Sequence, residues 1–299
     1  MKRIRNLTLF FLLAMSIGLA IAFGRLCWQQ ANIFVNVQRP IVTGSPADYG
    51  LSDAQVFEVV TSDNVSIRGW YIAPTREDGA TFIFVHGHGG TILDFLPEAN
   101  LYISMGYGAV LFDLRGGGDD GLPVTMGVNE VYDVEAIFNY LLTQNAVNPE
   151  RIALYGNSMG ASTAILSAAQ IPEIRIVIAD APYSSVRDTL VDGIPQRIGI
   201  PPLFFPDVII GMSNYLSGAN FYDASPINAL PEIEQPILFI HGTADTTIPY
   251  HHSEELYEAA NEPKVLYIVE GAGHTNNYEY DIAGYEAIVF PFLEQYLTN

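Results

Sequence analysis

Residues 152–169 read IALYGNSMGASTAILSAA. The apolar run 152–155 predicts a buried strand, and the residues after Gly160 predict a helix. Between them, residues 156–160 have the pattern Gly-x-Ser-x-Gly, in which a tight strand-to-helix turn raises the middle residue above the sheet. Steric crowding in such a turn requires glycine at both flanks. The stretch therefore predicts an α/β fold that presents Ser158 as a nucleophile at a helix N-terminus; the alternative is a glycine-rich turn with a solvated serine.

Short apolar runs alternate with helical patterns along most of the remaining chain. Continuous apolar strands are typical of parallel sheets buried on both faces, and their alternation with helices predicts a doubly wound α/β domain. An antiparallel hairpin comes first, with strands 55–61 and 65–72. Together these runs predict a mostly parallel eight-stranded sheet with helices on both faces. The later predicted strands are 81–85, 109–113, 152–155, 176–179, 237–240 and 265–269, and the predicted helices are 130–143, 159–169, 253–260 and 283–297.

The stretch 184–234 interrupts this alternation. It holds apolar clusters and several prolines but no strand–helix unit. A long insertion inside a compact domain is usually functional, so this stretch predicts a helical cap over the serine. We expect an N-terminal membrane-directed segment over 1–28, a linker and entry segment over 29–52, and one domain with its cap over 53–299.

A serine hydroxyl is a poor nucleophile unless a base takes its proton. In chains with this turn, the acid and then the histidine follow the nucleophile. His274 follows the last predicted strand in the glycine-rich loop 271–274, which predicts the general base. Asp245 lies in the sequence HGTAD at 241–245 and would orient the histidine and stabilise its charged form. The alternative for Asp245 is a turn-forming residue that caps the next helix.

Two backbone N–H groups are needed to hold the oxyanion of the reaction. The predicted donors are Met159, which follows the nucleophile, and His88 in the loop HGHGG at 86–90. The histidines of this loop are alternatively metal ligands, but no further ligand cluster stands out, so we expect no metal and no cofactor. His251 and His252 begin an acidic helix, where we expect solvated side chains.

The composition excludes some classes of protein. Of 299 residues, 49% are hydrophobic and 15% charged, which favours a large core and argues against disorder. The net charge of −20 repels phosphate backbones, so nucleic acid is not an expected partner. The expected partner is a small-molecule or peptide substrate. Cys27 is the only cysteine, which excludes a disulfide within the chain.

The N-terminus has the pattern of a membrane-directed segment. Basic residues within the first five positions precede the uncharged, mostly apolar run 7–23. This order keeps the N-terminus in the cytoplasm and exports the chain after the run. The run is either a signal peptide cleaved at the small-x-small site 20–22 or an uncleaved anchor. The anchor is favoured, which predicts a single-pass protein of the cell membrane with its catalytic domain outside the cytoplasm; the alternative is a secreted protein.

The chain resembles the α/β-hydrolase superfamily, and within it bacterial membrane-anchored proteins related to the serine aminopeptidase-like hydrolases. The resemblance covers about residues 57–297. It rests on GWY at 69–71, HGHGG at 86–90, DLRG at 113–116, GNSMG at 156–160, DAPY at 180–183, HGTAD at 241–245 and GAGH at 271–274. It implies structural roles for Asp113 and Arg115 in bracing the loop near the nucleophile. Asp119 and Asp120 depart from the pattern, since relatives often carry a serine there.

These features together predict a serine hydrolase that cleaves ester, thioester or amide bonds through an acyl-enzyme on Ser158. A carboxylesterase acting on a hydrophobic or acyl substrate is favoured, because the cap is apolar and no charged cluster for recognising a peptide terminus is evident. A serine peptidase of the aminopeptidase-like type is the alternative. A non-catalytic binding protein on the same fold is a further alternative, disfavoured by the presence of all three triad residues.

Overall fold

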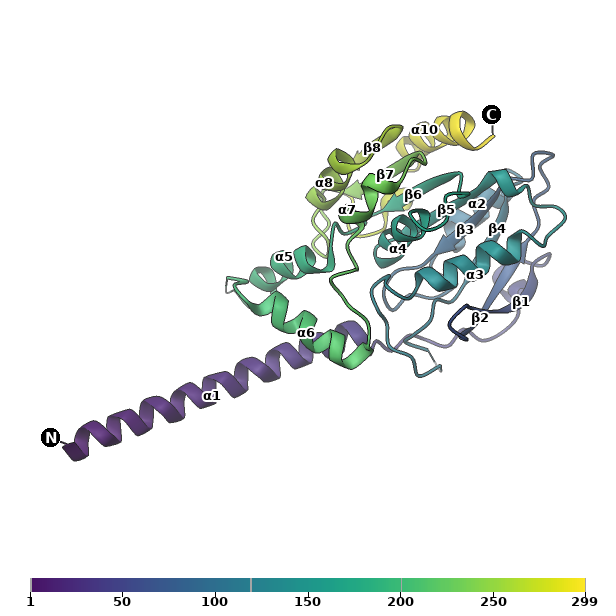
Figure 1. The fold of residues 1–299 in the computed structure, drawn as a ribbon. Coiled ribbons are helices and arrows are strands. Elements are labelled where there is room, and N and C mark those ends of the chain that lie inside the picture. The colour runs from purple at the N-terminus through teal and green to yellow at the C-terminus, as the bar shows by residue number, and fades with distance from the viewer. Residues whose placement is uncertain (1, 119, 200, 299) are drawn as a thin grey trace.

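The computed structural model of the chain describes residues 2–118, 120–199 and 201–298, and it contains one eight-stranded sheet (Figure 1). The strand order is β1-β2-β4-β3-β5-β6-β7-β8. The first two strands form the predicted antiparallel hairpin, β2 is antiparallel to β4, and the remaining pairs are parallel. The mostly parallel eight-stranded sheet is therefore confirmed. The strands are β1 (Gln55–Val60), β2 (Ser66–Ile72), β3 (Thr81–Val85), β4 (Gly108–Phe112), β5 (Ile152–Asn157), β6 (Ile176–Asp180), β7 (Ile237–Gly242) and β8 (Lys264–Val269).

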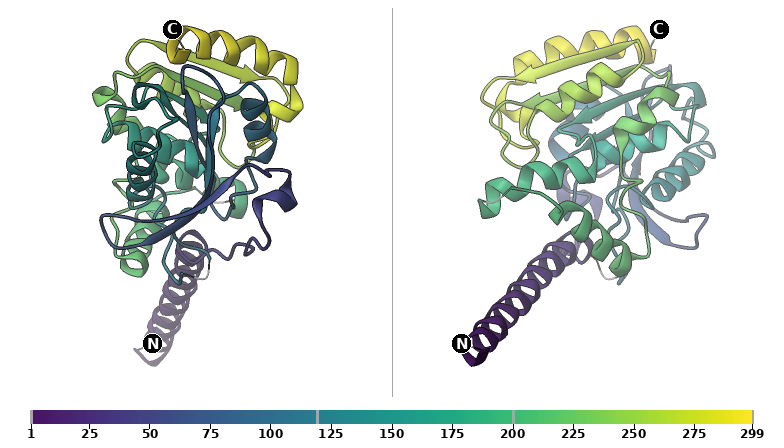
Figure 2. Two further views of the ribbon diagram at one scale, coloured as in Figure 1. Left: turned by 90° about the vertical axis from the view of Figure 1, so that its right-hand side faces the viewer. Right: turned by 60° about the vertical axis from the view of Figure 1, so that its left-hand side comes forward.

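Helices cover both faces of the sheet, as predicted (Figure 2). Alternate side chains of a strand point to opposite faces, so Phe82 and Phe84 of β3 join one buried cluster and Ile83 and Val85 join the other. The first cluster is covered by α2 (Leu96–Ser104) and α10 (Ile282–Leu293). The other is covered by α3 (Val131–Leu141), α4 (Met159–Ala168) and α8 (His251–Ala259). Smaller elements complete the chain: α7 (Pro226–Ala229), α9 (Asn277–Tyr280) and short helical turns at Pro46–Tyr49, Pro149–Arg151, Leu230–Glu232 and Glu294–Thr298.

The stretch 184–234 contains helices but no strand in its described residues, with α5 (Val186–Ile198) and α6 (Phe205–Ser217) as its longest elements. Both lie beside the C-terminal half of α1 (Figure 1). The ring of Phe23 packs against Phe204 and Phe205, with ring centroids 5.2 and 4.5 Å apart. The apolar residues of this stretch therefore meet the N-terminal helix as well as the sheet domain. Its role as a cap, and the domain boundaries, stay predictions.

The N-terminal helix α1 (Lys2–Val35) continues beyond residue 28, where the linker is predicted to begin. It is long and apolar enough to cross a membrane, judged by length and composition. Residues 4–22 are exposed and project from the domain (Figure 1), whereas Cys27, Ala31 and Val35 are fully buried in the core. Their spacing of four residues places them on one helix face. The start of the predicted linker is helical because this face packs against the domain.

Glu98 on α2 is a buried carboxyl group that makes the stability of the fold depend on pH. Its side chain is buried, and its Oε2 has no hydrogen-bond partner among the described residues. Burial raises the pKa of Glu98 to about 8. In the unfolded chain the pKa is about 4.3, so between about pH 4 and pH 8 the folded state keeps a proton that the unfolded state has released, and stability falls as the pH rises through this window.

We therefore expect Glu98→Gln to raise the melting temperature at pH 8 and to change it little at pH 4.5, where the wild-type carboxyl is protonated in the folded state. Circular dichroism melts at both pH values measure this difference. Glu255→Gln, at an exposed position on α8, is the matched control and should give equal shifts at both. An equal effect of Glu98→Gln at the two pH values would contradict the assignment of a raised pKa.

Candidate active site

Ser158 occupies the turn between β5 and α4, with φ 54° and ψ −123°. This left-handed backbone is costly for a residue with a side chain and is typical of functional sites. A Cβ at Gly156 would lie 2.2 Å from the carbonyl oxygen of Gly160, and one at Gly160 would lie 1.9 Å from that of Val85. Backbone atoms cannot move away to make room, so both flanking glycines of the motif are required. The turn has the geometry that the sequence predicts.

The structure brings the three predicted catalytic side chains into one line. Nε2 of His274 lies 2.9 Å from Oγ of Ser158, and Nδ1 of His274 lies 2.6 Å from Oδ2 of Asp245. In the arrangement that satisfies both contacts, Ser158 donates its hydroxyl proton to Nε2 and Nδ1–H donates to the carboxylate. All three residues stand where β5, β7 and β8 end, at one edge of the sheet.

The carboxylate of Asp245 is held in its charged form by the loop around it. Burial alone would raise its pKa, but hydrogen bonds from His241 and His274 outweigh burial, and the pKa of Asp245 lies well below its usual range. Its Oδ1 also accepts the N–H groups of Thr247 and Ile248 at 2.8 and 2.9 Å. Asp245 therefore remains an acceptor for His274 throughout the physiological pH range.

His241 braces the loop that carries Asp245, a contact that the sequence analysis did not predict. It is buried, and its Nε2 lies 2.8 Å from the carbonyl of Ile248 and 3.2 Å from Oδ2 of Asp245. Its Nδ1 accepts a hydrogen bond from the hydroxyl of Ser253 at 2.7 Å. The ring thus ties the loop that carries Asp245 to helix α8. The signal available in the sequence was the first histidine of HGTAD, four residues before the acid.

The loop 86–90 packs directly against Ser158. A Cβ at Gly87 would lie 3.1 Å from Cβ of Ser158, so glycine lets the loop approach closely. Within the described part of the chain, the backbone N–H groups of His88 and Met159 donate to no protein acceptor. Two unpaired N–H groups near a nucleophile are what an oxyanion hole requires. The predicted donors are thus available.

The imidazoles of His86 and His88 hold this loop in place. Nδ1–H of His86 donates to the carbonyl of Gly87 at 2.8 Å, and its Nε2 accepts from the N–H of Leu114 at 3.0 Å. Burial lowers the pKa of His86 to about 4, so the ring is neutral. Nε2–H of His88 donates to the carbonyl of Phe34 in α1 at 2.8 Å. These hydrogen bonds occupy ring nitrogens that a metal ion would need, and they fix the loop instead. They therefore argue against the metal-binding alternative.

The aspartates and the arginine of the segment 113–120 have structural contacts. Arg115 donates to Asp133 at 2.8 Å and to Asp63 at 2.9 Å, and Asp113 accepts the N–H of Ile92 at 2.8 Å. These bonds brace the segment, as the resemblance implies. Asp120 accepts the N–H of Gly116 at 2.8 Å and closes the glycine turn, whereas Asp119 lies outside the described residues.

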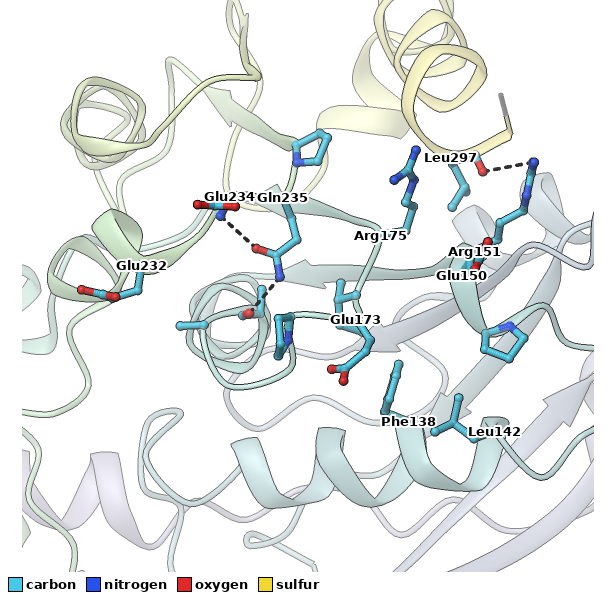
Figure 3. A pocket seen from close by; sticks show the side chains of 16 residues that line it. Phe138, Leu142, Glu150, Arg151, Glu173, Arg175, Glu232, Glu234, Gln235 and Leu297 are labelled. Carbon is cyan, nitrogen blue, oxygen red and sulfur yellow. Dashed lines mark hydrogen bonds between the residues drawn. The ribbon is translucent and has the colours of Figure 1, made fainter.

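Two of the cavities differ in position and in lining. One of about 800 Å³ is lined by residues at the N-terminal ends of β5, β6 and β7, among them Glu150, Arg151 and Arg175, and none of the triad residues lines it (Figure 3). The other, of about 30 Å³, is apolar and lies between α1, α5 and α6. Phe34, whose carbonyl holds His88, lines this second cavity. The small apolar cavity therefore adjoins the part of α1 that holds the loop 86–90.

Comparison with known proteins identifies the family. A family model for the prolyl oligopeptidase family matches residues 93–299. YfhR of Escherichia coli O157:H7 is 30% identical over 237 residues, covering 74% of this chain and 73% of YfhR. YqkD of Bacillus subtilis (strain 168) is 28% identical over 241 residues, covering 80% of this chain and 78% of YqkD.

Solved structures agree with this result. The Pyrococcus furiosus esterase Pf2001 superposes with a TM-score of 0.73 at 25% identity and covers 88% of this chain and 98% of its own. The Pyrococcus horikoshii acylaminoacyl peptidase superposes with a TM-score of 0.65 at 21% identity, over 86% of this chain and 44% of its own, and supports the fold. The α/β-hydrolase fold predicted from the sequence is confirmed. The chain is a serine hydrolase and belongs to the prolyl oligopeptidase family.

Proposed function

We propose that this hydrolase is a membrane-anchored carboxylesterase that acts on esters with an apolar acyl chain, with Ser158 as its nucleophile. The observation that carries the proposal is the line from Oγ of Ser158 through His274 to Asp245, at 2.9 and 2.6 Å. The net charge of −20 makes nucleic acid an unsuitable partner. The exposed apolar stretch 4–22 of α1 serves as the anchor in this proposal.

The residues have these roles in the proposed mechanism. His274 takes the proton of Ser158 as Oγ attacks the carbonyl carbon of the ester, and Asp245 stabilises the resulting imidazolium. The N–H groups of His88 and Met159 hold the negative charge that develops on the carbonyl oxygen. His274 then gives its proton to the departing alcohol, and a water molecule activated by the same histidine releases the acid and regenerates Ser158.

An apolar acyl chain is favoured by the side chains that line the small cavity between α1, α5 and α6, rather than by its volume of about 30 Å³. No Asp, Glu, Lys or Arg is among the described residues that line it, which are Leu26, Gln30, Phe34, Thr189, Leu190, Gly193, Ile194, Phe205 and Ile209. A peptide substrate of an aminopeptidase needs a charged partner for its terminus, and this cavity offers none. The esterase is therefore preferred to the peptidase alternative.

Acyl-chain preference tests the proposal. The full chain in detergent is labelled with a fluorophosphonate probe and assayed on p-nitrophenyl esters of increasing acyl length and on aminoacyl p-nitroanilides. We expect labelling, slow cleavage of the anilides, and a kcat/KM that rises by up to about fourfold per methylene while the chain fits the apolar site, the equivalent of about 0.8 kcal/mol per buried CH₂. Faster cleavage of the anilides would instead support the peptidase.

A matched pair of variants locates the acyl site. Gly193 on α5 lines the cavity, so Gly193→Leu is expected to shift the preference to shorter esters. Gly211 on α6 faces open space, with nothing within 4 Å of a Cβ built on it, so Gly211→Leu is the control and should keep the wild-type profile. The same chain-length profile in both variants would place the acyl chain elsewhere.

A further inference from the structure

Three potential metal ligands from two helices meet beside the cap. Asp192 lies on α5, and His251 and His252 are the first residues of α8. Oδ2 of Asp192 is 3.0 Å from Nε2 of His251 and 3.1 Å from Nε2 of His252. All three ligand atoms lie within 4.8 Å of one another. The expectation that both histidines are solvated is wrong for His252, whose side chain is fully buried with Asp192 and Ser184 beside it.

Among the described residues, two buried atoms of this cluster lack hydrogen-bond partners. Neither Nε2 of His252 nor Oδ2 of Asp192 has a hydrogen-bond partner of good geometry in the described ranges, although both atoms are shielded from solvent. A buried polar atom without a partner costs about 1–3 kcal/mol, and such an atom in a native protein calls for an explanation such as a bound ion. The ring of His252 is also fixed, since its Nδ1 lies 2.7 Å from Oγ of Ser184.

We propose that Asp192, His251 and His252 bind a divalent transition-metal ion, with zinc as the best fit. Zinc takes nitrogen and oxygen ligands at about 2.0–2.1 Å in a tetrahedron, which places the ligand atoms about 3.3 Å apart. The two separations to Asp192 are within a few tenths of an ångström of this value. Two imidazoles with one carboxylate suit zinc rather than magnesium or calcium, which prefer oxygen ligands.

The surroundings supply the other requirements of such a site. A metal at Nε2 of His252 requires the ring proton on Nδ1, and Oγ of Ser184 is in place to accept it. The side chains of Asp192 and His251 are 28% and 42% exposed, so an ion can enter from solvent and a water molecule can complete the tetrahedron. The site is separate from Ser158, His274 and Asp245, and none of its ligands belongs to the triad.

The ion would fasten the cap to the sheet domain. It joins α5 to α8, and Ser253, the residue after His252, holds the ring of His241 that braces the Asp245 loop. The metal therefore acts as a structural clamp between the cap and this loop.

The rival explanation is a metal-free contact. In it, Nδ1 of His252 accepts the N–H of Ser184, which lies 3.2 Å away, and the carboxylate of Asp192 faces the Nε2–H groups of the two histidines. The two explanations place the proton of His252 on opposite ring nitrogens, and only the first leaves Nε2 free to bind an ion.

Metal binding by the full chain in detergent distinguishes the two explanations. The protein is produced without a histidine tag, stripped with EDTA, and titrated with zinc chloride in a calorimeter and with cobalt chloride in a spectrophotometer. We expect one equivalent of zinc to bind, a melting temperature that rises with zinc and saturates, and the visible absorption bands of tetrahedral cobalt. Absence of binding by the wild-type chain would overturn the proposal.

Variants assign the ligands. Asp192→Asn keeps the shape of the side chain, and Asp192 is partly exposed, so the variant should fold; His251→Ala removes a second ligand that is also partly exposed. Loss of a residue that only hydrogen-bonds to a metal ligand weakens binding by about 10–100-fold. Each of these variants loses a ligand itself, so each should weaken zinc binding by more than that. Glu255→Gln on the exposed face of α8 is the control and should bind zinc as the wild type does. Wild-type zinc affinity in both ligand variants would place the ion elsewhere and refute the site.

Discussion

Ser158→Ala is expected to lower kcat/KM for ester hydrolysis by about 10⁴–10⁶-fold and to abolish labelling by a fluorophosphonate. The reason is geometric, since Oγ of Ser158 is the hydroxyl within hydrogen-bond distance of Nε2 of His274. Alanine keeps the Cβ and therefore the same backbone strain at φ 54°, so the turn is preserved. The residual rate would come from binding and from the N–H groups of His88 and Met159.

The control lies on the helix that the nucleophile begins. Ser167 on α4 is fully buried, and its Oγ has no hydrogen-bond partner within the part of the chain that the structure describes. Ser167→Ala removes a hydroxyl without breaking a bond, so activity should stay near the wild-type value and the melting temperature should stay the same or rise. Labelling that persists in Ser158→Ala would refute Ser158 as the nucleophile, while melting curves of both variants report on folding.

Local sterics and chain order dictate the features that could be predicted from the sequence. Gly156 and Gly160 predict the turn because a side chain at either position would collide with backbone atoms. At Gly156 it would meet the backbone of Gly160, and at Gly160 that of Val85. Asp245 and His274 could be found because they follow two strands of a parallel sheet, whose carboxyl ends share one edge. Their meeting with Ser158 follows from topology, without knowledge of any side-chain contact.

The features missed depend on contacts between elements distant in the chain. His252 lies in the first turn of an acidic helix and has no local signal of burial, yet its side chain is buried and Asp192 of α5 lies beside it. The hydrogen bond between His88 and Phe34 uses the backbone carbonyl of Phe34. Every residue has such a carbonyl, so no pattern of side chains predicts this contact. The docking of α1 did have a signal, because Cys27, Ala31 and Val35 recur at a spacing of four residues.

The packing of α1 against the domain is the basis of the second prediction, a deletion. Removal of residues 1–35 is expected to abolish the folded, active enzyme, because it uncovers the core around Cys27, Ala31 and Val35. The deletion also removes two hydrogen-bond acceptors. The carbonyl of Phe34 accepts from the ring of His88, and the carbonyl of Val35 accepts the N–H of Val124 at 2.9 Å. Uncovering several buried apolar side chains at about 1.5–3 kcal/mol each is comparable with the whole stability of a domain.

Removal of residues 1–22 is the matched control. The deleted residues from position 4 onward are exposed, and the docked half of α1 remains from Phe23. The shorter deletion should therefore keep the wild-type melting temperature and ester hydrolysis but lose flotation with lipid vesicles. It also reproduces the product of cleavage after Ala22, so a secreted form would retain the oxyanion loop contacts. If the chain lacking 1–35 melts and hydrolyses like the wild type, α1 is a tether alone; if it fails while the chain lacking 1–22 succeeds, the second half of α1 is part of the hydrolase.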